Sequence, residues 1–190
     1  MVQERFPPIA PADLNASQQQ LIAHYRAGWQ SQLAAPDGRL GGPFDTLLRS
    51  PQMGLRMAAL SDFFRIECAI APRLKEFVIL LCARASDSAF EWAVHCDWAA
   101  KAGLPSPIIE SIGRDERPDS MTQEEAAIFE VIQDLRATQT VREESFLRAR
   151  HCLGEQPLVE LVGLFGYYRL VALVLGLADV RPPPASVPLR

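Results

Sequence analysis

The stretch from residue 72 to residue 86, PRLKEFVILLCARAS, limits most strongly what this chain can fold into. Pro72 suits the first turn of a helix, and residues 77 to 83 are apolar at nearly every position around a helical wheel. A helix that is apolar all round has no side that favours water. We therefore predict a helix over residues 72 to 86 at the centre of a bundle, with other helices covering it.

The rest of the chain predicts further helices and no sheet. The sequence lacks the alternating, β-branched runs bounded by turn signals that strands require. Proline and glycine instead divide the chain into helical segments, so we predict an all-α fold. The predicted helices cover about residues 13 to 33, 52 to 67, 72 to 86, 88 to 102, 106 to 114, 123 to 137 and 142 to 154, with a last helix from about residue 157. Residues 35 to 43 are a predicted loop and a candidate lid over a site, and residues 181 to 188 an extended tail.

Two of the predicted helices carry local signals. In the helix over residues 52 to 67, four apolar residues at helical spacing predict a stripe that faces the core: Met53, Met57, Leu60 and Phe64. Thr122 is followed three residues later by Glu125, which is the spacing of a capping box and predicts a helix start at Gln123.

The composition is that of a globular protein and argues against several classes of partner. The 190 residues include 19 basic and 23 acidic ones, which gives a formal net charge of −4, and no run of Lys and Arg forms a phosphate-binding stripe. We therefore predict no nucleic acid partner. The first 14 residues lack the basic and apolar regions of a secretory signal, which favours a cytoplasmic protein.

The most apolar segment, residues 158 to 180, raises the question of a membrane span. Glu160 and Arg169 interrupt it, whereas a spanning helix needs about 20 mainly apolar residues without such charges. We predict a buried or subunit-interface helix instead and no membrane partner. The length and apolarity of this helix favour association of the chain with copies of itself.

The cysteines do not indicate a disulfide framework or a zinc site. The chain has four, and none belongs to a C-x-x-C motif: Cys68, Cys82, Cys96 and Cys152. This pattern is typical of reduced cytosolic thiols that behave as small apolar residues. We predict no metal site and no cofactor.

One predicted helix face combines ionisable residues with small ones. On a helical wheel, five residues share a narrow stripe: Ser88, Glu91, His95, Ala99 and Ala102. Trp92 lies beside this stripe, and Asp97 and Lys101 lie on the opposite side. A spacing of four residues lets the Glu91 carboxylate reach the His95 ring, which would prepare the ring as a general acid or base. A structural pair in the core is the alternative.

The segment FEWAVHCDWAAKAGL, preceded by RLKEFVILLCARAS and followed by SPIIESI, resembles the signature region of the carboxymuconolactone decarboxylase family, which includes the alkylhydroperoxidase D (AhpD-like) proteins. The likeness extends from about residue 44 to residue 188 and is most specific from residue 76 to residue 103. It implies an AhpD-like helical bundle as a single domain, residues 1 to 190, with an N-terminal helical extension over about residues 1 to 43 and a proline-rich tail at residues 181 to 190. It also implies a symmetric homo-oligomer, from dimer to hexamer.

The peroxidase branch of that family is recognised by a Glu, two Cys and a His at fixed spacing. This chain keeps the spacing with different occupants of the two cysteine positions: Glu76, Ser88, Glu91 and His95. Peroxide reduction needs an attacking thiolate and a second thiol, which Ser88 and Glu91 cannot supply. The resemblance therefore disfavours a dithiol hydroperoxidase, and Cys96 acting alone is the remaining thiol alternative.

The glutamate in the second cysteine position is similar to the cofactor-free decarboxylase branch, whose substrates are anionic lactones. The resemblance implies an acid–base lyase for a small anionic lactone or related carbonyl compound, with His95 as proton donor or relay and Glu91 orienting it. Glu76 would complete the relay with His95, or would form an ordinary ion pair with Arg73 one turn earlier. A helical oligomer that binds a small molecule without catalysis is a further alternative.

An anionic substrate also needs polar groups around the catalytic residues. Three arginines near the motif are candidates for a cation: Arg49, Arg73 and Arg84. We predict substrate contacts from four residues: Ser88, Trp92, Arg84 and Tyr168. For Trp92, Arg84 and Tyr168, an ordinary structural role is the alternative. His24 and His151 have no companions at catalytic spacing and are predicted to be surface residues.

Overall fold

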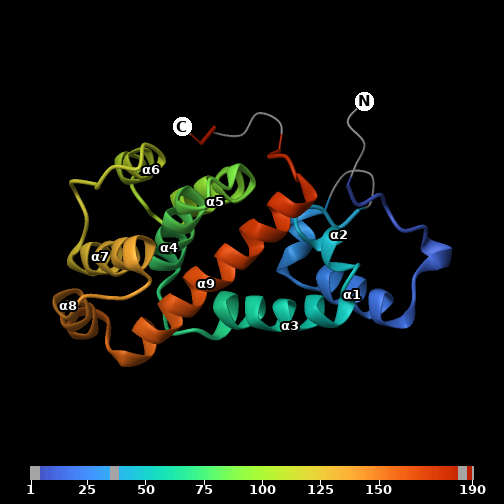
Figure 1. The fold of residues 1–190 in the computed structure, drawn as a ribbon, viewed down its shortest axis with the longest axis horizontal. Helices are drawn as coiled ribbons and strands as arrows, with labels where there is room; N and C mark the ends of the chain where they lie inside the picture. Colours follow the sequence, from blue (N-terminus) through green and yellow to red (C-terminus); the bar gives the residue numbers. More distant parts are fainter. Residues whose placement is uncertain (1–4, 35–38, 184–187, 190) are drawn as a thin grey trace. The chain divides into compact units, whose positions relative to one another are not determined.

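The computed structural model describes residues 5–34, 39–183 and 188–189, and every regular element among them is helical (Figure 1). The predicted all-α fold is therefore confirmed for the described residues. The chain divides into two compact units. The N-terminal unit comprises Met1–Glu67 with Leu173–Val180, and the central unit comprises Cys68–Ala172 with Arg181–Arg190. The N-terminal unit thus continues past residue 43, and the single domain remains a prediction.

The described part of the N-terminal unit packs short helices around one longer pair. Its α-helices are α1 (Ala16–Ala27), α2 (Phe44–Leu47) and α3 (Pro51–Asp62). Single helical turns lie at Pro11–Asp13, Trp29–Leu33 and, as a π-helical turn, Phe63–Glu67. α1 packs against α3, and the buried Leu21 and Tyr25 come from this contact side of α1.

The predicted single helix over residues 13 to 33 is wrong in its extent. α1 begins after Asn15, which forms a capping box with Gln18, and ends at Gly28, whose backbone is extended with φ −90° and ψ −177°. A Cβ atom at Gly28 would lie 2.3 Å from Oε1 of the buried Gln30. Glycine therefore lets the chain turn closely over Gln30, and this turn breaks the helix.

The predicted inward stripe of α3 is also partly wrong. Met53 and Leu60 are 39% and 43% exposed, whereas the buried residues of α3 are mostly small: Gly54, Met57, Ala58 and Ser61. A Cβ atom at Gly54 would lie 2.4 Å from Cδ2 of Leu21. The small residues let α1 approach α3 closely, and this approach turns the small side of α3 inward. Phe64, which follows α3, is buried as predicted.

In the central unit, α5, α6 and α7 pack against α4, and α8 packs against α7 (Figure 1). Its elements are α4 (Pro72–Ala85), α5 (Ala89–Lys101), α6 (Ser106–Gly113), α7 (Gln123–Thr138), α8 (Glu143–Leu153) and the first part of α9 (Glu155–Ala178). All residues of α4 from 74 to 83 are buried, and α4 contacts α5, α6 and α7. The sequence prediction of a central helix at this place is confirmed.

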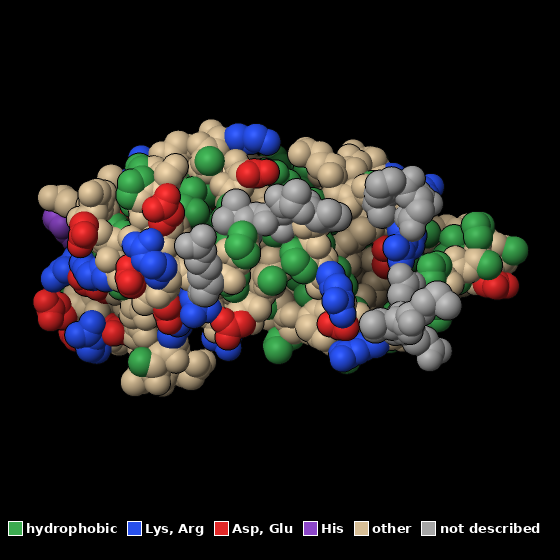
Figure 2. All heavy atoms as spheres, turned by 90° about the horizontal axis from the view of Figure 1, so that it is seen from above, with side chains coloured by type: hydrophobic (Ala, Val, Ile, Leu, Met, Phe, Trp, Pro, Cys, Tyr) green, Lys and Arg blue, Asp and Glu red, His purple; other side chains and the backbone are tan. Residues whose placement is uncertain are grey.

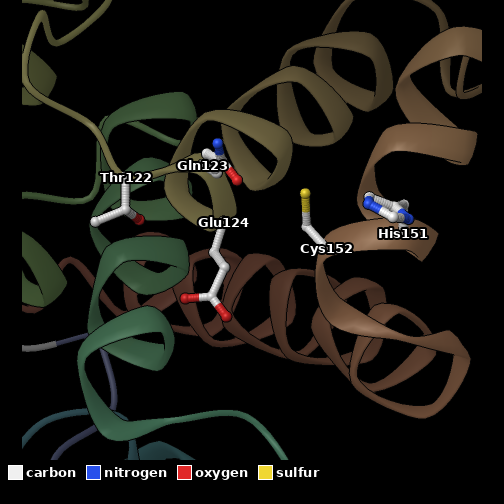
Figure 3. Close-up of a pocket in the computed structure, with 5 residues that line it drawn as sticks. All are labelled: Thr122, Gln123, Glu124, His151 and Cys152. Carbon is white, nitrogen blue, oxygen red and sulfur yellow. The ribbon is translucent and has the colours of Figure 1, made fainter.

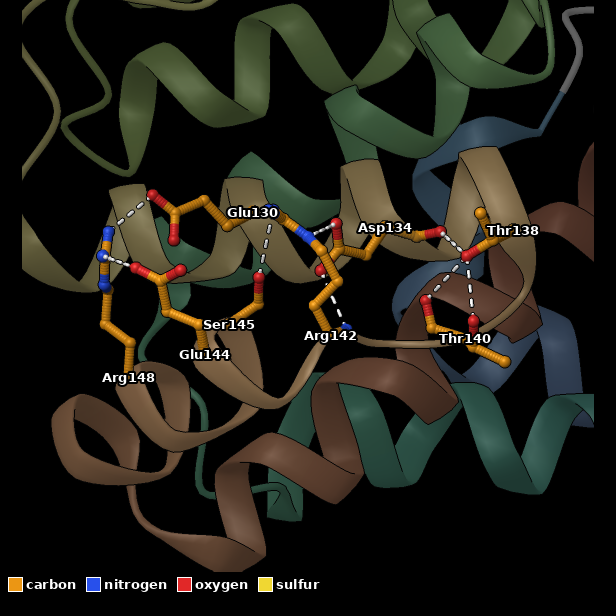
Figure 4. Close-up of polar contacts among 8 residues, drawn as sticks. All are labelled: Glu130, Asp134, Thr138, Thr140, Arg142, Glu144, Ser145 and Arg148. Carbon is orange, nitrogen blue, oxygen red and sulfur yellow. Dashed lines mark hydrogen bonds and ion pairs between the residues drawn. The ribbon is translucent and has the colours of Figure 1, made fainter.

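Ion pairs and hydrogen bonds join α7 to α8 (Figure 4). Asp134 accepts bonds from Arg142 through Nε (2.7 Å) and through the backbone N–H (3.1 Å), which fixes the start of α8. Arg148 binds Glu130 on α7 at 2.7 Å and Glu144 on its own helix at 3.2 Å. These contacts join α7 and α8 at the surface. Each exposed ion pair contributes little to the stability of the fold.

α9 is the only helix among the described residues that is long and apolar enough to cross a membrane by length and composition. The core helix of a soluble protein passes the same test, and 39% of the apolar window of α9 is buried in the structure. Glu160 on this helix accepts a hydrogen bond from the backbone N–H of Ala69 at 2.6 Å. One of the two charged residues that interrupt the apolar segment therefore has a structural role. Apolar side chains remain exposed at Val159 (73%), Leu173 (72%) and Leu177 (60%).

Two predicted segments fall partly outside the described residues. The candidate lid over residues 35 to 43 includes residues 35–38, and the extended tail over residues 181 to 188 includes residues 184–187. Both predictions remain untested there.

Candidate functional site

The predicted stripe of α5 does face the interior of the central unit. Its first four residues are buried: Ser88, Glu91, His95 and Ala99. Asp97 and Lys101 are exposed on the opposite side, as the helical wheel predicts. Two ionisable side chains one turn apart therefore lie in the core, where each needs a partner or must stay neutral.

His95 binds Glu76 and not Glu91, which corrects the predicted pair. Nδ1 of His95 lies 2.7 Å from Oε2 of Glu76, and the two side chains are only 6% and 5% exposed. α4 and α5 pack side by side, so residues far apart in sequence meet across the contact. Neither carboxylate oxygen of Glu91 forms a hydrogen bond to His95 or to any other described residue. Arg73 binds Glu125, and the relay role of Glu76 remains a prediction.

Two aromatic rings pack against the imidazole of His95. The Trp98 ring lies 5.0 Å from it at 78°, and the Tyr168 ring lies 5.1 Å away at 88°. The carboxyl of Glu76 faces Nδ1 and orients the ring, so Nε2 is the ring nitrogen that this contact leaves open. The sequence prediction included Tyr168 and missed Trp98, although Trp98 follows His95 by three residues on the same helix.

Glu91 lies in the core without a hydrogen-bond partner among the described residues. Only 2% of the residue is exposed, and neither carboxylate oxygen is paired. Burial raises the pKa of Glu91 from 4.5 to about 8, and the nearby Ser88 hydroxyl acts weakly in the opposite direction without forming a hydrogen bond of ordinary geometry. Glu91 is therefore mostly a neutral carboxylic acid at pH 7.

Ser88 stands at the N-cap of α5 and does not cap it. Its Oγ has no hydrogen-bond partner among the described residues, and its backbone N–H donates to the Ala83 oxygen at 2.9 Å. This bond closes the turn between α4 and α5. Ser88 and Glu91 have capping-box spacing, and this spacing is the sequence signal that links the two residues to the helix start.

The three arginines considered for a substrate cation all have partners. Arg73 binds Glu125 through Nε and Nη2, each 2.7 Å from Oε1, and Arg84 pairs with Asp87. Arg49, in the N-terminal unit, donates to a backbone oxygen. The predicted substrate contact from Arg84 remains a prediction; its Nη1 binds Asp87, and its buried Nε has no hydrogen-bond partner among the described residues.

Trp92 packs against α6. A Cβ atom at Gly113 would lie 3.0 Å from Cζ2 of Trp92, so the indole ring fills the space that glycine leaves. Its Nε1 is buried without a hydrogen-bond partner among the described residues. The contact with α6 agrees with the core alternative for Trp92, and its predicted substrate contact remains a prediction.

The cysteines and the other two histidines form no metal site among the described residues. None of the four cysteines forms a disulfide, and among the described residues no group of three or more His, Cys, Asp or Glu could hold a metal ion. Burial raises the pKa of Cys82 to about 12, and the Glu91 charge adds to this rise; burial also raises the pKa of Cys96 to about 12. His151 is exposed as predicted, whereas His24 is half-buried, with Nε2 2.9 Å from Oδ2 of Asp62.

Two pockets of the central unit lie away from these residues. The larger, about 500 Å³, is lined by the start of α7 and the end of α8: Thr122, Gln123, Glu124, His151 and Cys152 (Figure 3). The smaller, about 110 Å³, is mostly apolar and lies between residues 69–71, α4, α7 and the start of α9. None of the predicted site residues lines either pocket.

Comparison with known proteins gives no independent support for the family resemblance. No protein-family model matches this chain, and a search of curated proteins finds no match either.

Proposed function

We propose that this chain is a cofactor-independent acid–base enzyme of the carboxymuconolactone decarboxylase type, which acts on a small anionic lactone or related carbonyl compound. The observation that carries the proposal is the buried pair of His95 with Glu76, one helical turn from the unpaired Glu91. The oriented imidazole of His95 can act as a base, and the neutral carboxylic acid of Glu91 can act as an acid. Their different environments in the same core assign them these two roles.

The chemistry assigned to this pair is proton transfer around a carbonyl group. Glu76 holds Nδ1 of His95, so Nε2 is the atom that accepts a proton. Glu91, with a pKa of about 8, is the group that donates one at neutral pH. In a decarboxylation, the bond to the leaving CO₂ breaks, its electron pair is delocalised onto the lactone carbonyl, and the carbon then takes the proton of Glu91. His95 accepts a solvent proton at Nε2 and passes it to the Glu91 carboxylate, which restores the acid. We therefore assign the orientation of His95 to Glu76, whereas the sequence had suggested Glu91.

The thiol peroxidase alternative is weaker on this geometry. A peroxidatic cysteine has to be a thiolate, and burial keeps the thiols of Cys82 and Cys96 protonated, each with a pKa of about 12. Both residues also lack a second cysteine within a shared motif. Cys82 donates instead to the backbone oxygen of Phe165 at 3.4 Å, which is the contact of a structural thiol.

Self-association in the cytoplasm is part of the proposal. The exposed apolar side chains of α9 are the support for a homo-oligomer, because large apolar groups in water favour burial against a partner. Figure 2 shows one face on which Lys and Arg side chains lie among Asp and Glu side chains, a distribution that does not favour nucleic acid. Light scattering after size-exclusion chromatography would measure the oligomeric state.

The test of the proposed function is turnover of a panel of lactone carboxylates, followed by CO₂ release and by solvent deuterium incorporation in proton NMR. Replacement His95→Gln keeps a polar side chain of similar size and removes the base, so we expect a loss of about 10²- to 10⁴-fold in kcat. The matched control is His151→Gln at the exposed histidine, which should leave turnover unchanged. Equal turnover in His95→Gln and the parent chain would contradict the proposal.

A non-catalytic binding protein is the second candidate, and the unpaired polar atoms of Ser88 and Glu91 favour it as much as they favour an enzyme. It predicts that a lactone carboxylate binds to the chain while no member of the panel releases CO₂ or gains deuterium. Binding titrations run beside the product assays therefore separate the two candidates.

A further inference from the structure

Two helices of the central unit begin with the same sequence pattern. α5 begins with Ser88 and carries Glu91 three residues later, and α7 begins with Thr122 and carries Glu125 three residues later. This is the capping-box pattern, in which the first side chain accepts the third N–H and the glutamate accepts the first N–H. At α7 the box is closed, with bonds of 3.1 Å and 2.9 Å.

At α5 the box is open because the turn before the helix uses one of its groups. The backbone N–H of Ser88, which Glu91 would have to accept, donates to the Ala83 oxygen at 2.9 Å. The backbone of Ser88 has ψ 89°, whereas ψ is 168° at Thr122, so the Ser88 hydroxyl does not reach the N–H groups of the first turn. Local capping cannot satisfy this helix end.

The open end of α5 presents hydrogen-bond donors beside two buried side chains, although Ala89 is exposed and Phe90 is half-buried. The first N–H with an intrahelical partner is that of Trp92, which donates to the Ser88 oxygen at 3.0 Å, and the N–H groups of Ala89, Phe90 and Glu91 precede it. The Ser88 hydroxyl and the neutral Glu91 carboxyl add two O–H donors, and the two residues are only 8% and 2% exposed. Each of these two buried O–H donors costs about 1–3 kcal/mol when it finds no acceptor.

An acceptor with negative charge fits this end best. The positive end of the helix dipole favours an anion, and a neutral Glu91 does not repel one. A carboxylate has two oxygens, which match the two side-chain donors or one side chain and the first-turn N–H groups. Arg73 is paired with Glu125 and Arg84 with Asp87, and of these two guanidinium groups the buried Nε of Arg84 is the atom left without a hydrogen-bond partner among the described residues.

We propose that the N-terminal end of α5 is the subsite for the carboxylate group of the substrate, held by the Ser88 hydroxyl, the Glu91 carboxyl and the N–H groups of the first turn. The catalytic role of this subsite rests on the proposed function. In that reaction, Glu91 would hold the carboxylate that leaves as CO₂ and would also supply the proton that replaces it. Its ligand class, a small carboxylate, can be tested without any turnover.

The test uses acetate as the probe and acetamide, its uncharged analogue, as the control ligand. Nitrogen–proton correlation spectra of the full chain should show that acetate shifts the amide signals of residues 89 to 91 and that acetamide does not. Ser88→Ala should weaken acetate binding at least about tenfold, because a hydrogen bond to a charged group is lost. Ser106→Ala, at the exposed start of α6, is the matched control and should bind acetate like the parent chain.

Two further variants keep the outcomes separate. Glu91→Gln retains a donor and should still bind acetate, whereas Glu91→Met removes the donor and should weaken binding, with circular dichroism as the check of folding. His95→Gln should bind acetate normally while it loses turnover, so failure of catalysis leaves the subsite standing. Acetate shifts that spread over other helix ends, or that persist unchanged in Ser88→Ala and Glu91→Met, would overturn the subsite even where turnover depends on His95.

Discussion

The starts of α5 and α7 have the same pattern of residues and opposite structures. At α7, Thr122 and Glu125 bond each other's backbone, and Arg73 from α4 binds the same glutamate. At α5, Ser88 and Glu91 bond neither each other's backbone nor a cation among the described residues. The difference teaches that a capping box needs a free N–H at its first residue, and that a buried glutamate needs a cation to remain charged.

The preceding chain explains why the two ends differ. α5 follows α4 after a turn of three residues, in which the Ser88 N–H closes back on the Ala83 oxygen. α7 follows a longer connection after Gly113, so the Thr122 N–H is available to Glu125. A tight connection therefore leaves the α5 donors open to an acceptor from outside the helix, and a long one lets α7 satisfy itself.

The largest expected effect is at the closed end. Glu125→Ala removes a fully buried carboxylate that binds Arg73 and caps α7, and we expect a loss of about 3 kcal/mol in the free energy of unfolding. Urea unfolding followed by circular dichroism would measure it. The comparison would break if this variant unfolded at the parent's urea midpoint, because α7 would then not depend on its closed box.

The open end should respond in the opposite direction. The pKa of Glu91 is about 8 in the folded chain, against 4.5 for an ordinary glutamate, so the folded chain holds this proton more tightly than the unfolded chain. The tighter binding of this proton stabilises the folded chain. This stabilisation is complete below pH 4.5 and is lost as the pH rises through 8. Glu91→Gln lacks this loss, and we expect it to be more stable than the parent by about 2 kcal/mol at pH 8 and nearly equal to it at pH 4.5. The full pKa shift would give a larger difference, but a folded chain relaxes around a buried charge.

Urea unfolding of both chains at several pH values would measure this difference. The matched control is Glu110→Gln at an exposed glutamate of α6, for which the difference from the parent should not grow between pH 4.5 and pH 8. A Glu91→Gln variant that is less stable than the parent at pH 8 would show that the folded chain uses the charged form of Glu91.

Local sequence rules predicted much of the central unit and little of its site. The apolar residues of α4 could only be buried, and the pattern at Thr122 required no distant partner, so both predictions are confirmed. The break at Gly28 depends on the space needed by Gln30 two residues later, which a helical pattern does not show.

The partner of His95 could not be read from spacing along one helix. Glu91 has the right distance in sequence, but Nδ1 of His95 is bound by Glu76 and the Glu91 oxygens stay unpaired. Glu76 is 19 residues away and becomes the partner only because α4 and α5 pack together. The family resemblance had already placed Glu76 and His95 in the same sequence motif. Their contact, however, forms only through the packing of α4 against α5.

The smallest expected effect compares the two N-cap hydroxyls directly. Thr122→Ala removes an acceptor for the Glu125 N–H and should lower the free energy of unfolding by about 1 kcal/mol. Ser88→Ala removes a hydroxyl that forms no hydrogen bond to the described residues, and we expect a change within about 0.5 kcal/mol or a slight gain, since a buried unpaired donor disappears. Both variants are measured by urea unfolding at neutral pH without carboxylate ions. Equal losses would mean that Ser88 does cap α5 in solution, and the two helix starts would then be alike.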